Sequence, residues 1–355
     1  MTGKGTWRGI WQRTGPIVLP IVFSLVVAEP MLRLVGHHAF KGLTTGGVPY
    51  EPDGELGWRN RPGIYHLINA ADGNRPFTET ILPDGSRATR LSAIPEATGT
   101  RSAGLRSILF FGCSFTRGFG IDDRDVMEWK LQERFPSVDV SNYGVGGYGT
   151  LQSLLLMKRL LGQAGAAKPA LVVYGFNSFH AERNVGAPGF LSVMARGSQS
   201  QNVKLPVAAL GPAGSIQVLF ENGYPLLPLR QHLALVTLAE ESYMYATRIH
   251  RTFKREEVTR KLILMSRDLT EQHGVQFVVL LLRVEPKTKE GLIRFLERER
   301  ISYIDGDRAD AGDPRWLVPG DTHPNGQMHG YWAELVAGYV EKRFIGTNDH
   351  RAAEQ

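Results

Sequence analysis

Ser114, Asp321 and His323 are the residues of this sequence whose side chains could together break an ester bond. A serine hydroxyl is a weak nucleophile near neutral pH, and it needs a base to take its proton. A histidine supplies that base when an acid holds its ring in the correct orientation and tautomer. Asp321 stands two residues before His323. We therefore predict that Ser114 is the nucleophile, His323 its general base and Asp321 the orienting acid.

Acyl transfer also requires hydrogen-bond donors for the negatively charged oxygen of the tetrahedral intermediate. The backbone N–H groups of Ser114 and Gly147 and the side-chain amide of Asn177 are candidates for this oxyanion hole. A glycine suits position 147 because a close backbone approach leaves no room for a side chain. Each residue alone is common in turns and loops, so the interpretation depends on where the residues stand relative to the predicted strands.

Strands and helices alternate through the second part of the chain. Short apolar runs predict strands, and apolar residues at helical spacing predict helices, at 107–111, 122–135, 138–140, 150–161, 169–174, 261–273, 275–282, 301–304 and 331–344. This alternation is typical of a parallel sheet with helices on both faces. Ligands bind such sheets at the carboxyl ends of the strands, and Ser114, Gly147 and Asn177 each follow a predicted strand.

Four segments resemble, in order, the conserved blocks of the SGNH, or GDSL-type, hydrolases. They are Gly112-Cys113-Ser114, Asn142–Gly147, Gly175-Phe176-Asn177-Ser178 and Asp321-Thr322-His323. The resemblance implies a three-layer α/β/α sandwich with a five-stranded, flavodoxin-like parallel sheet. It also implies a serine esterase that needs neither a cofactor nor a metal, with Ser114, Gly147 and Asn177 forming the oxyanion hole.

The sequence departs from the family pattern at three places. Cys113 precedes the serine and Ser178 follows the asparagine, where the family usually has aspartate, and Asp321 stands two rather than three residues before the histidine. The spacing, and the segment from Tyr50 to Arg59, resemble a membrane-anchored bacterial branch. Cys113 itself is an alternative nucleophile, although on an extended backbone it points away from the side of Ser114.

The chain divides into four parts in our interpretation. Residues 1–36 are an N-terminal anchor or signal segment, and 37–104 form a small β-rich lead-in. Residues 105–345 form the hydrolase domain, which contains an inserted lid or hairpin at 186–230 that is rich in glycine and proline. Residues 346–355 are expected to be a flexible tail.

The N-terminal segment allows three interpretations: an uncleaved signal anchor, a cleaved signal peptide, or a helix of a soluble protein. Three basic residues precede an apolar run at 15–28, and Glu29 and Arg33 follow it. The run of about 14 residues is short for a membrane span, which needs about 20. The basic head predicts contact with the membrane through residues 15–36, inner-membrane anchoring, and a catalytic domain that faces the periplasm or the exterior.

Composition excludes several other classes of protein. Hydrophobic residues make up 42% of the 355 residues and charged residues 21%, which is typical of a folded chain. The net charge of +6 includes no run of Lys and Arg, so nucleic acid is not an expected partner. Cys113 is the single cysteine, which excludes an intramolecular disulfide and a Cys-rich zinc site.

Three functional hypotheses remain open at this point. The first is an esterase that removes small acyl groups, such as acetyl, from a glycan or another envelope-associated substrate. The second is an O-acyltransferase that passes the acyl group to an extracellular polysaccharide, and the third is a catalytically silent scaffold. His180, Arg183 and Arg283 lie near the predicted strand ends and are candidates for contacts with substrate at the rim of the site.

Overall fold

A five-stranded parallel sheet lies at the centre of the protein in the computed structural model, which describes residues 5–40, 49–69, 75–91, 107–163, 168–196, 204–222 and 224–345. Its strands are β5 (Ser107–Gly112), β6 (Asp139–Gly144), β7 (Leu171–Asn177), β10 (Gln276–Arg283) and β11 (Ser302–Asp305). They are ordered β11-β10-β7-β5-β6. Counted along the chain this is the flavodoxin-like order 2-1-3-4-5, so the predicted fold class is confirmed.

The strand register places the catalytic loops at one edge of the sheet. Gly112, at the end of β5, pairs with Gly144 of β6, and Phe111 pairs with Tyr174 of β7. All seven residues of β7 are buried. Strands covered on both faces are apolar throughout rather than alternating, which is why these segments stand out in the sequence.

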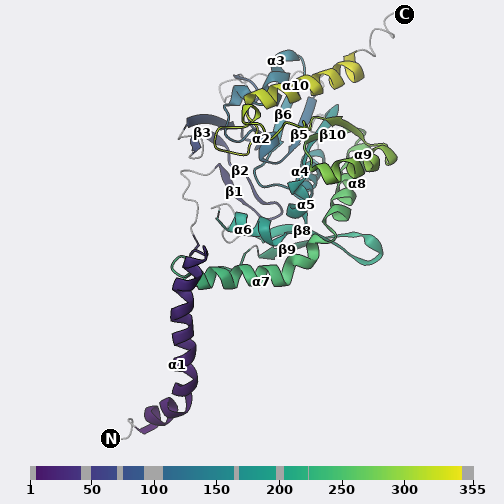
Figure 1. Cartoon of the computed structure of the whole chain (residues 1–355). Helices are drawn as coiled ribbons and strands as arrows, with labels where there is room; N and C mark the ends of the chain where they lie inside the picture. The colour runs from purple at the N-terminus through teal and green to yellow at the C-terminus, as the bar shows by residue number, and fades with distance from the viewer. Residues whose placement is uncertain are drawn as a thin grey trace, which may run out of the picture.

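Helices cover both faces of the sheet (Figure 1). On one face α3 (Met127–Arg134) and α10 (Gly326–Val340) contribute to a core with β5, β7 and β10. The other face is covered by α4 (Thr150–Leu161), α8 (Arg255–Gln272) and α9 (Pro286–Arg298). Short helical turns complete this part of the chain at Ser114–Arg117 (α2), Asp123–Asp125, Pro314–Trp316 and Glu341–Ile345.

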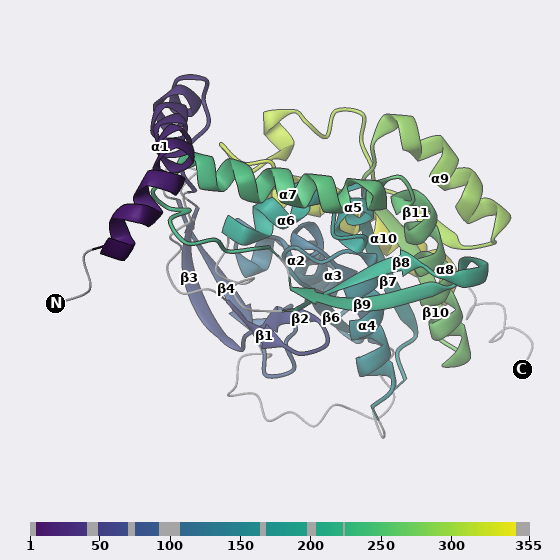
Figure 2. The same cartoon turned by 90° about the horizontal axis from the view of Figure 1, so that it is seen from below.

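The lead-in folds as two antiparallel pairs of strands beside the sheet (Figure 2). The first pair is β1 (Tyr50–Asp53) with β2 (Gly57–Asn60), and the second is β3 (Gly63–Asn69) with β4 (Arg75–Ile81). Arg87 then fastens this part to the domain, because its fully buried guanidinium donates to the carbonyls of Arg117, Gly118 and Ile121.

The segment inserted after β7 contains both helices and a hairpin. After α5 (Phe179–Asn184) come α6 (Pro188–Arg196) and an antiparallel hairpin of β8 (Lys204–Leu210) and β9 (Ile216–Asn222). A turn at Pro212–Gly214 joins the two strands, and α7 (Ala234–Thr252) follows. Leu191 and Leu205 of this segment pack with Trp58 of the lead-in, so the insertion contacts the lead-in directly.

The N-terminal helix α1 (Gly5–Leu34) projects away from the rest of the molecule, and its C-terminal end contacts the start of α7 (Figure 1). Both carboxylate oxygens of Glu29 accept backbone N–H groups at the start of α7, each at 3.0 Å, and Arg33 donates to the carbonyl of His232 at 2.7 Å. Within the described residues no helix is both long and apolar enough to cross a membrane. The predicted transmembrane helix is therefore not supported. Its apolar run is short, and the charged residues that follow it, Glu29 and Arg33, hydrogen-bond to the segment at the start of α7.

The predicted flexible tail at 346–355 lies outside the described residues, as do residues 92–106, which precede β5.

Candidate active site

Ser114, His323 and Asp321 form a continuous hydrogen-bonded chain. The Nε2 atom of His323 lies 2.9 Å from Oγ of Ser114, and its Nδ1 atom lies 2.8 Å from Oδ1 of Asp321. This is the geometry in which a histidine can take the serine proton through one ring nitrogen while the acid holds the other. The two predicted segments, 209 residues apart in sequence, thus meet at one point.

The turn between β5 and α2 presents Ser114 to His323. Gly112 has a φ of 159°, and a Cβ atom there would lie 2.1 Å from Oγ1 of Thr116 and 2.9 Å from the carbonyl oxygen of Gly175. A side chain at this position is therefore excluded. Ser114 is the first residue of α2 and keeps 8% of its surface exposed. Cys113 is fully buried in the core under α3, so the alternative nucleophile has no access to a substrate.

Two aromatic rings and the catalytic loop hold the ring of His323. Phe119 and Phe115 contact the imidazole with ring centroids 4.8 and 5.5 Å away. The backbone N–H groups of Thr322 and His323 also donate to Oδ1 of Asp321, at 2.5 and 3.1 Å. These contacts fix the loop that carries both the base and its orienting acid.

Asn69, at the end of β3 in the lead-in, completes the surroundings of Asp321. Its Nδ2 atom donates to Oδ2 of Asp321 at 3.0 Å. Burial raises the pKa of Asp321, but the hydrogen bonds from His323 and Asn69 outweigh burial and hold the pKa well below its ordinary value. Asp321 is therefore a carboxylate across the neutral range, as an orienting acid must be. No sequence pattern pointed to Asn69.

Among the described residues, the three predicted oxyanion donors have no hydrogen-bond acceptor that competes with a substrate. Asn177 is buried, its Oδ1 atom accepts the N–H of Phe179 at 3.0 Å, and its Nδ2 atom has no hydrogen-bond partner among the described residues. A buried unsatisfied donor costs free energy unless a ligand accepts from it. The N–H of Gly147 makes no hydrogen bond with the described residues. Ser114 is the first residue of α2, so its N–H has no partner within that helix.

A buried ion pair anchors the nucleophile turn from below. Arg117, the last residue of α2, pairs with Glu79 of β4, and neither side chain is exposed. Arg117 also donates to Oδ1 of Asn60 at 2.9 Å, and its guanidinium lies 4.5 Å from the ring centre of Tyr50. Breaking such a pair leaves an uncompensated buried charge. The lead-in is thus needed for the position of the turn that carries Ser114.

Of the three predicted rim residues, His180 is placed differently from the prediction. It is fully buried, with Nδ1 2.7 Å from the hydroxyl of Tyr174, and burial holds its pKa well below the ordinary value. The residue lies in the first turn of α5, which directs it inward. It is therefore a neutral interior residue rather than a contact for substrate.

The other two rim candidates stay at the border of the site. Arg183 is partly exposed, donates to the carbonyl of Tyr148 at 2.9 Å and lies 6.0 Å from the ring centre of Phe179. Arg283 donates to the carbonyl of Thr322 at 3.3 Å, which places it against the catalytic loop. Phe179 itself is 49% exposed and stands two residues after Asn177, so it adds an apolar surface next to that residue.

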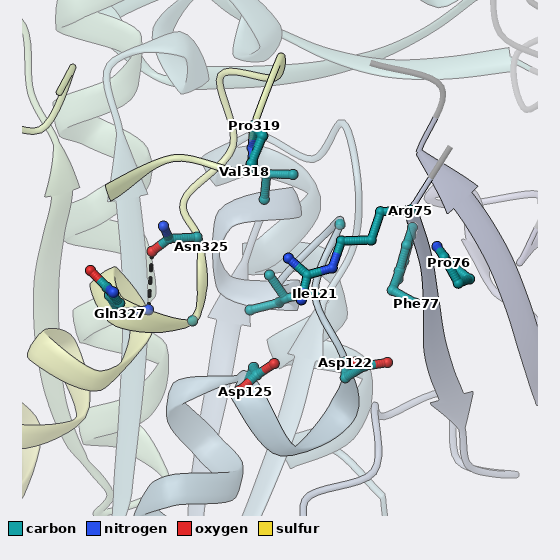
Figure 3. Close-up of a pocket in the computed structure, with 12 residues that line it drawn as sticks. Arg75, Pro76, Phe77, Ile121, Asp122, Asp125, Val318, Pro319, Asn325 and Gln327 are labelled. Atoms are coloured by element: carbon teal, nitrogen blue, oxygen red, sulfur yellow. Dashed lines mark hydrogen bonds between the residues drawn. The ribbon is translucent and has the colours of Figure 1, made fainter. Parts of the chain in front are cut away.

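A polar pocket of about 420 Å³ lies on the outer side of the catalytic loop (Figure 3). Val318, Pro319 and Asn325, at the two ends of this loop, form one wall, and Arg75 extends into the space from the opposite side. Asp122 and Asp125 form its floor. Within the described residues, no group of three His, Cys, Asp or Glu side chains is placed to hold a metal ion.

Comparison with known proteins finds similarity only among solved structures. Neither a protein-family profile nor a curated protein matches the sequence. TesA aligns over 67% of this chain and 99% of its own, with 14% identity and a TM-score of 0.41. The psychrotrophic esterase EstA from Pseudoalteromonas sp. aligns over 67% and 97%, with 10% identity and a TM-score of 0.40.

AlinE4, an SGNH-hydrolase family esterase, aligns over 68% of this chain and 97% of its own, with 15% identity and a TM-score of 0.36. With identities and TM-scores this low, these similarities do not assign an activity. The roles of the residues follow from the geometry of this site.

Proposed function

We propose that this protein is a carboxylic ester hydrolase that works through an acyl-enzyme on Ser114. The observation that carries the proposal is the hydrogen-bonded chain from Ser114 through His323 to Asp321, together with the buried side-chain nitrogen of Asn177, which has no hydrogen-bond partner among the described residues. A hydroxyl, a base, an orienting acid and available hydrogen-bond donors are the parts that acyl transfer requires. A scaffold has no need to keep a buried amide nitrogen without a partner.

The reaction follows from these positions in two halves. In the first, Oγ of Ser114 attacks the ester carbonyl, and its proton passes to Nε2 of His323. The N–H groups of Ser114 and Gly147 and the Asn177 amide stabilise the negative oxygen of the tetrahedral intermediate. The imidazolium then returns the proton to the departing alcohol oxygen, which leaves an acyl group on Ser114. In the second half a water molecule, deprotonated by His323, attacks the acyl group, and the released Ser114 recovers its proton.

The proposed substrate is a small acyl ester, such as an acetyl group, on a glycan or another polar envelope molecule. The polar pocket beside the catalytic loop supports an alcohol part that is rich in hydrogen-bonding groups, since Arg75 can donate there and Asp122 and Asp125 can accept. Basic residues precede the apolar run at 15–28, and this order supports a location of the catalytic domain on the outer side of the inner membrane. An alkaline phosphatase fusion after residue 40 tests that location, because this reporter is active only when exported.

The activity is tested by comparing the full chain with its Ser114→Ala variant on p-nitrophenyl acetate, p-nitrophenyl butyrate and acetylated oligosaccharides. We expect the wild type to release acid and Ser114→Ala to lose that activity, since removal of a triad serine costs on the order of 10⁶ in kcat. Equal rates for the two proteins on every ester would contradict the proposal. Transfer of the acyl group to an added glycan, in preference to water, would instead identify a transferase.

A further inference from the structure

The peptide unit between Gly146 and Gly147 is held by a residue from outside the hydrolase domain. Trp58, on β2 of the lead-in, donates its indole N–H to the carbonyl oxygen of Gly146 at 2.9 Å, and its side chain is fully buried. The indole cannot turn freely, because it is fully buried and the ring of Tyr148 packs against it edge to face. The hydroxyl of Tyr148 also donates to the backbone carbonyl of Trp58 at 2.5 Å, which holds the backbone of that residue. The hydrogen bond from Trp58 to Gly146 therefore joins β2 of the lead-in to the loop that follows β6.

The direction of the Gly147 N–H depends on this bond. The peptide bond is trans, and in a planar trans unit the N–H points away from the C=O of the same unit. A donor that fixes the carbonyl of Gly146 consequently fixes the N–H of Gly147, which has no hydrogen-bond partner of its own in the described residues. Two adjacent glycines otherwise leave such a unit free to rotate, since glycine accepts both signs of φ.

Close packing keeps the same unit from moving sideways. A Cβ atom on Gly147, whose φ is 83°, would lie 2.9 Å from Cζ2 of Trp58. A Cβ atom on Gly146 would lie 2.0 Å from the hydroxyl oxygen of Tyr50. The lead-in thus contacts both glycines, with an indole against one and a phenol against the other.

We propose that Trp58 is a positioning residue for the oxyanion hole, which aims the Gly147 N–H at the negative oxygen of the tetrahedral intermediate. The inference rests on the proposed ester hydrolysis and adds a task for the lead-in. Trp58 acts through Gly147 and does not touch the substrate. Its effect is therefore confined to the transition state, in which the oxygen carries charge, and does not extend to binding of the uncharged ester.

The test compares Trp58→Phe with the matched control Trp332→Phe on p-nitrophenyl acetate, using the full chain. Trp332 is equally buried and also donates its indole N–H to a glycine carbonyl, that of Gly306, at 2.9 Å, but it belongs to α10 and points into the core between that helix and the sheet. For Trp58→Phe we expect kcat to fall about tenfold with KM unchanged, which is less than the loss of a whole oxyanion donor. For Trp332→Phe we expect kcat to stay within about twofold, whatever the loss in thermal stability.

A wild-type kcat in folded Trp58→Phe, or an equal loss of kcat in both variants, would overturn the inference. If Trp58→Phe does not fold, a variant with 3-benzothienylalanine in place of Trp58 replaces it, because that residue keeps the shape of the indole and lacks the N–H that donates to Gly146. That variant should lose kcat and keep KM, and an unchanged kcat overturns the inference in the same way. Ser114→Ala is measured alongside. If it is as active as the wild type, the proposed function itself is wrong. If it is inactive, an unchanged kcat in the Trp58 variant contradicts only the role of Trp58.

Discussion

Asn69 offers the sharpest perturbation of the catalytic acid, because it contacts Asp321 and lies far from it in sequence. Its amide donates to Oδ2 of Asp321, while Oδ1 is bound by His323 and by the backbone of the catalytic loop. Asn69→Ala removes this hydrogen bond to Oδ2 and leaves the three hydrogen bonds to Oδ1 in place. A hydrogen bond to a charged group is worth about 1.5–3 kcal/mol.

We expect the lower end of that range for Asn69→Ala, since three contacts still orient the carboxylate. A loss of about 1.4 kcal/mol corresponds to a tenfold lower kcat, and KM should not change because Asn69 acts through its hydrogen bond to Asp321. His66→Ala is the control: it lies on the same strand, its side chain is exposed, and its ring contacts only the hydroxyl of Thr78 in the hydrogen bonds described. It should leave kcat unchanged.

Asn69→Asp gives the same experiment a signature in its pH dependence. It places a second carboxyl about 3.0 Å from that of Asp321, and two carboxylates so close share one proton, with one pKa of the pair raised. As pH rises through that value, the second charge forms and disturbs Asp321. Activity relative to the wild type should therefore fall as pH rises through the raised pKa of the pair. A wild-type kcat in Asn69→Ala, together with a pH profile of Asn69→Asp that overlays the wild type, would refute the role given to Asn69.

Two further predictions concern other buried groups. Asn177→Ala should lower kcat by about 10²–10³, because its Nδ2 atom has no partner among the described residues and is available to the oxyanion, whereas its Oδ1 atom loses one hydrogen bond, from the N–H of Phe179; a kcat within threefold of wild type would exclude its amide from the oxyanion hole. Burial raises the pKa of Glu128 from 4.5 to about 8, against the weaker opposing effect of Arg87. The stability that comes with a protonated Glu128 is present below pH 4.5 and is lost as pH rises to about 8. In urea titrations Glu128→Gln should match the wild type near pH 4.5 and exceed it at pH 8, and identical pH dependence in the two proteins would show that Glu128 does not control it.

The sheet and the positions of the catalytic loops followed from local sequence. Strands buried on both faces are apolar throughout, and the residues that follow them stand at one edge of the sheet. Element boundaries were less accurate. The last helix begins at Gly326 rather than near 331, because Asn325 accepts the N–H groups of Gln327 and Met328 and starts the helix early. Two glycines in the first turns had concealed that start.

The supporting residues could not be predicted, because their partners are distant in sequence. Trp58 and Gly146 are 88 residues apart, and Asn69 and Asp321 are 252 apart. No spacing rule connects such pairs, and each residue alone looks like an ordinary strand residue. The expected contact of His180 with substrate differs from the structure for the opposite reason. His180 is near Asn177 in sequence, but the helix that begins at Phe179 directs its side chain into the core.

Covalent trapping of the nucleophile tests the central claim most directly. A phosphonate ester with a good leaving group forms a stable tetrahedral adduct on an activated serine, and mass spectrometry of the digested protein locates it. Because Ser114 lies 2.9 Å from Nε2 of His323 while Cys113 is fully buried, we predict one adduct on Ser114 in the wild type and none in Ser114→Ala. An adduct on Cys113, or equal labelling of the two proteins, would contradict the account.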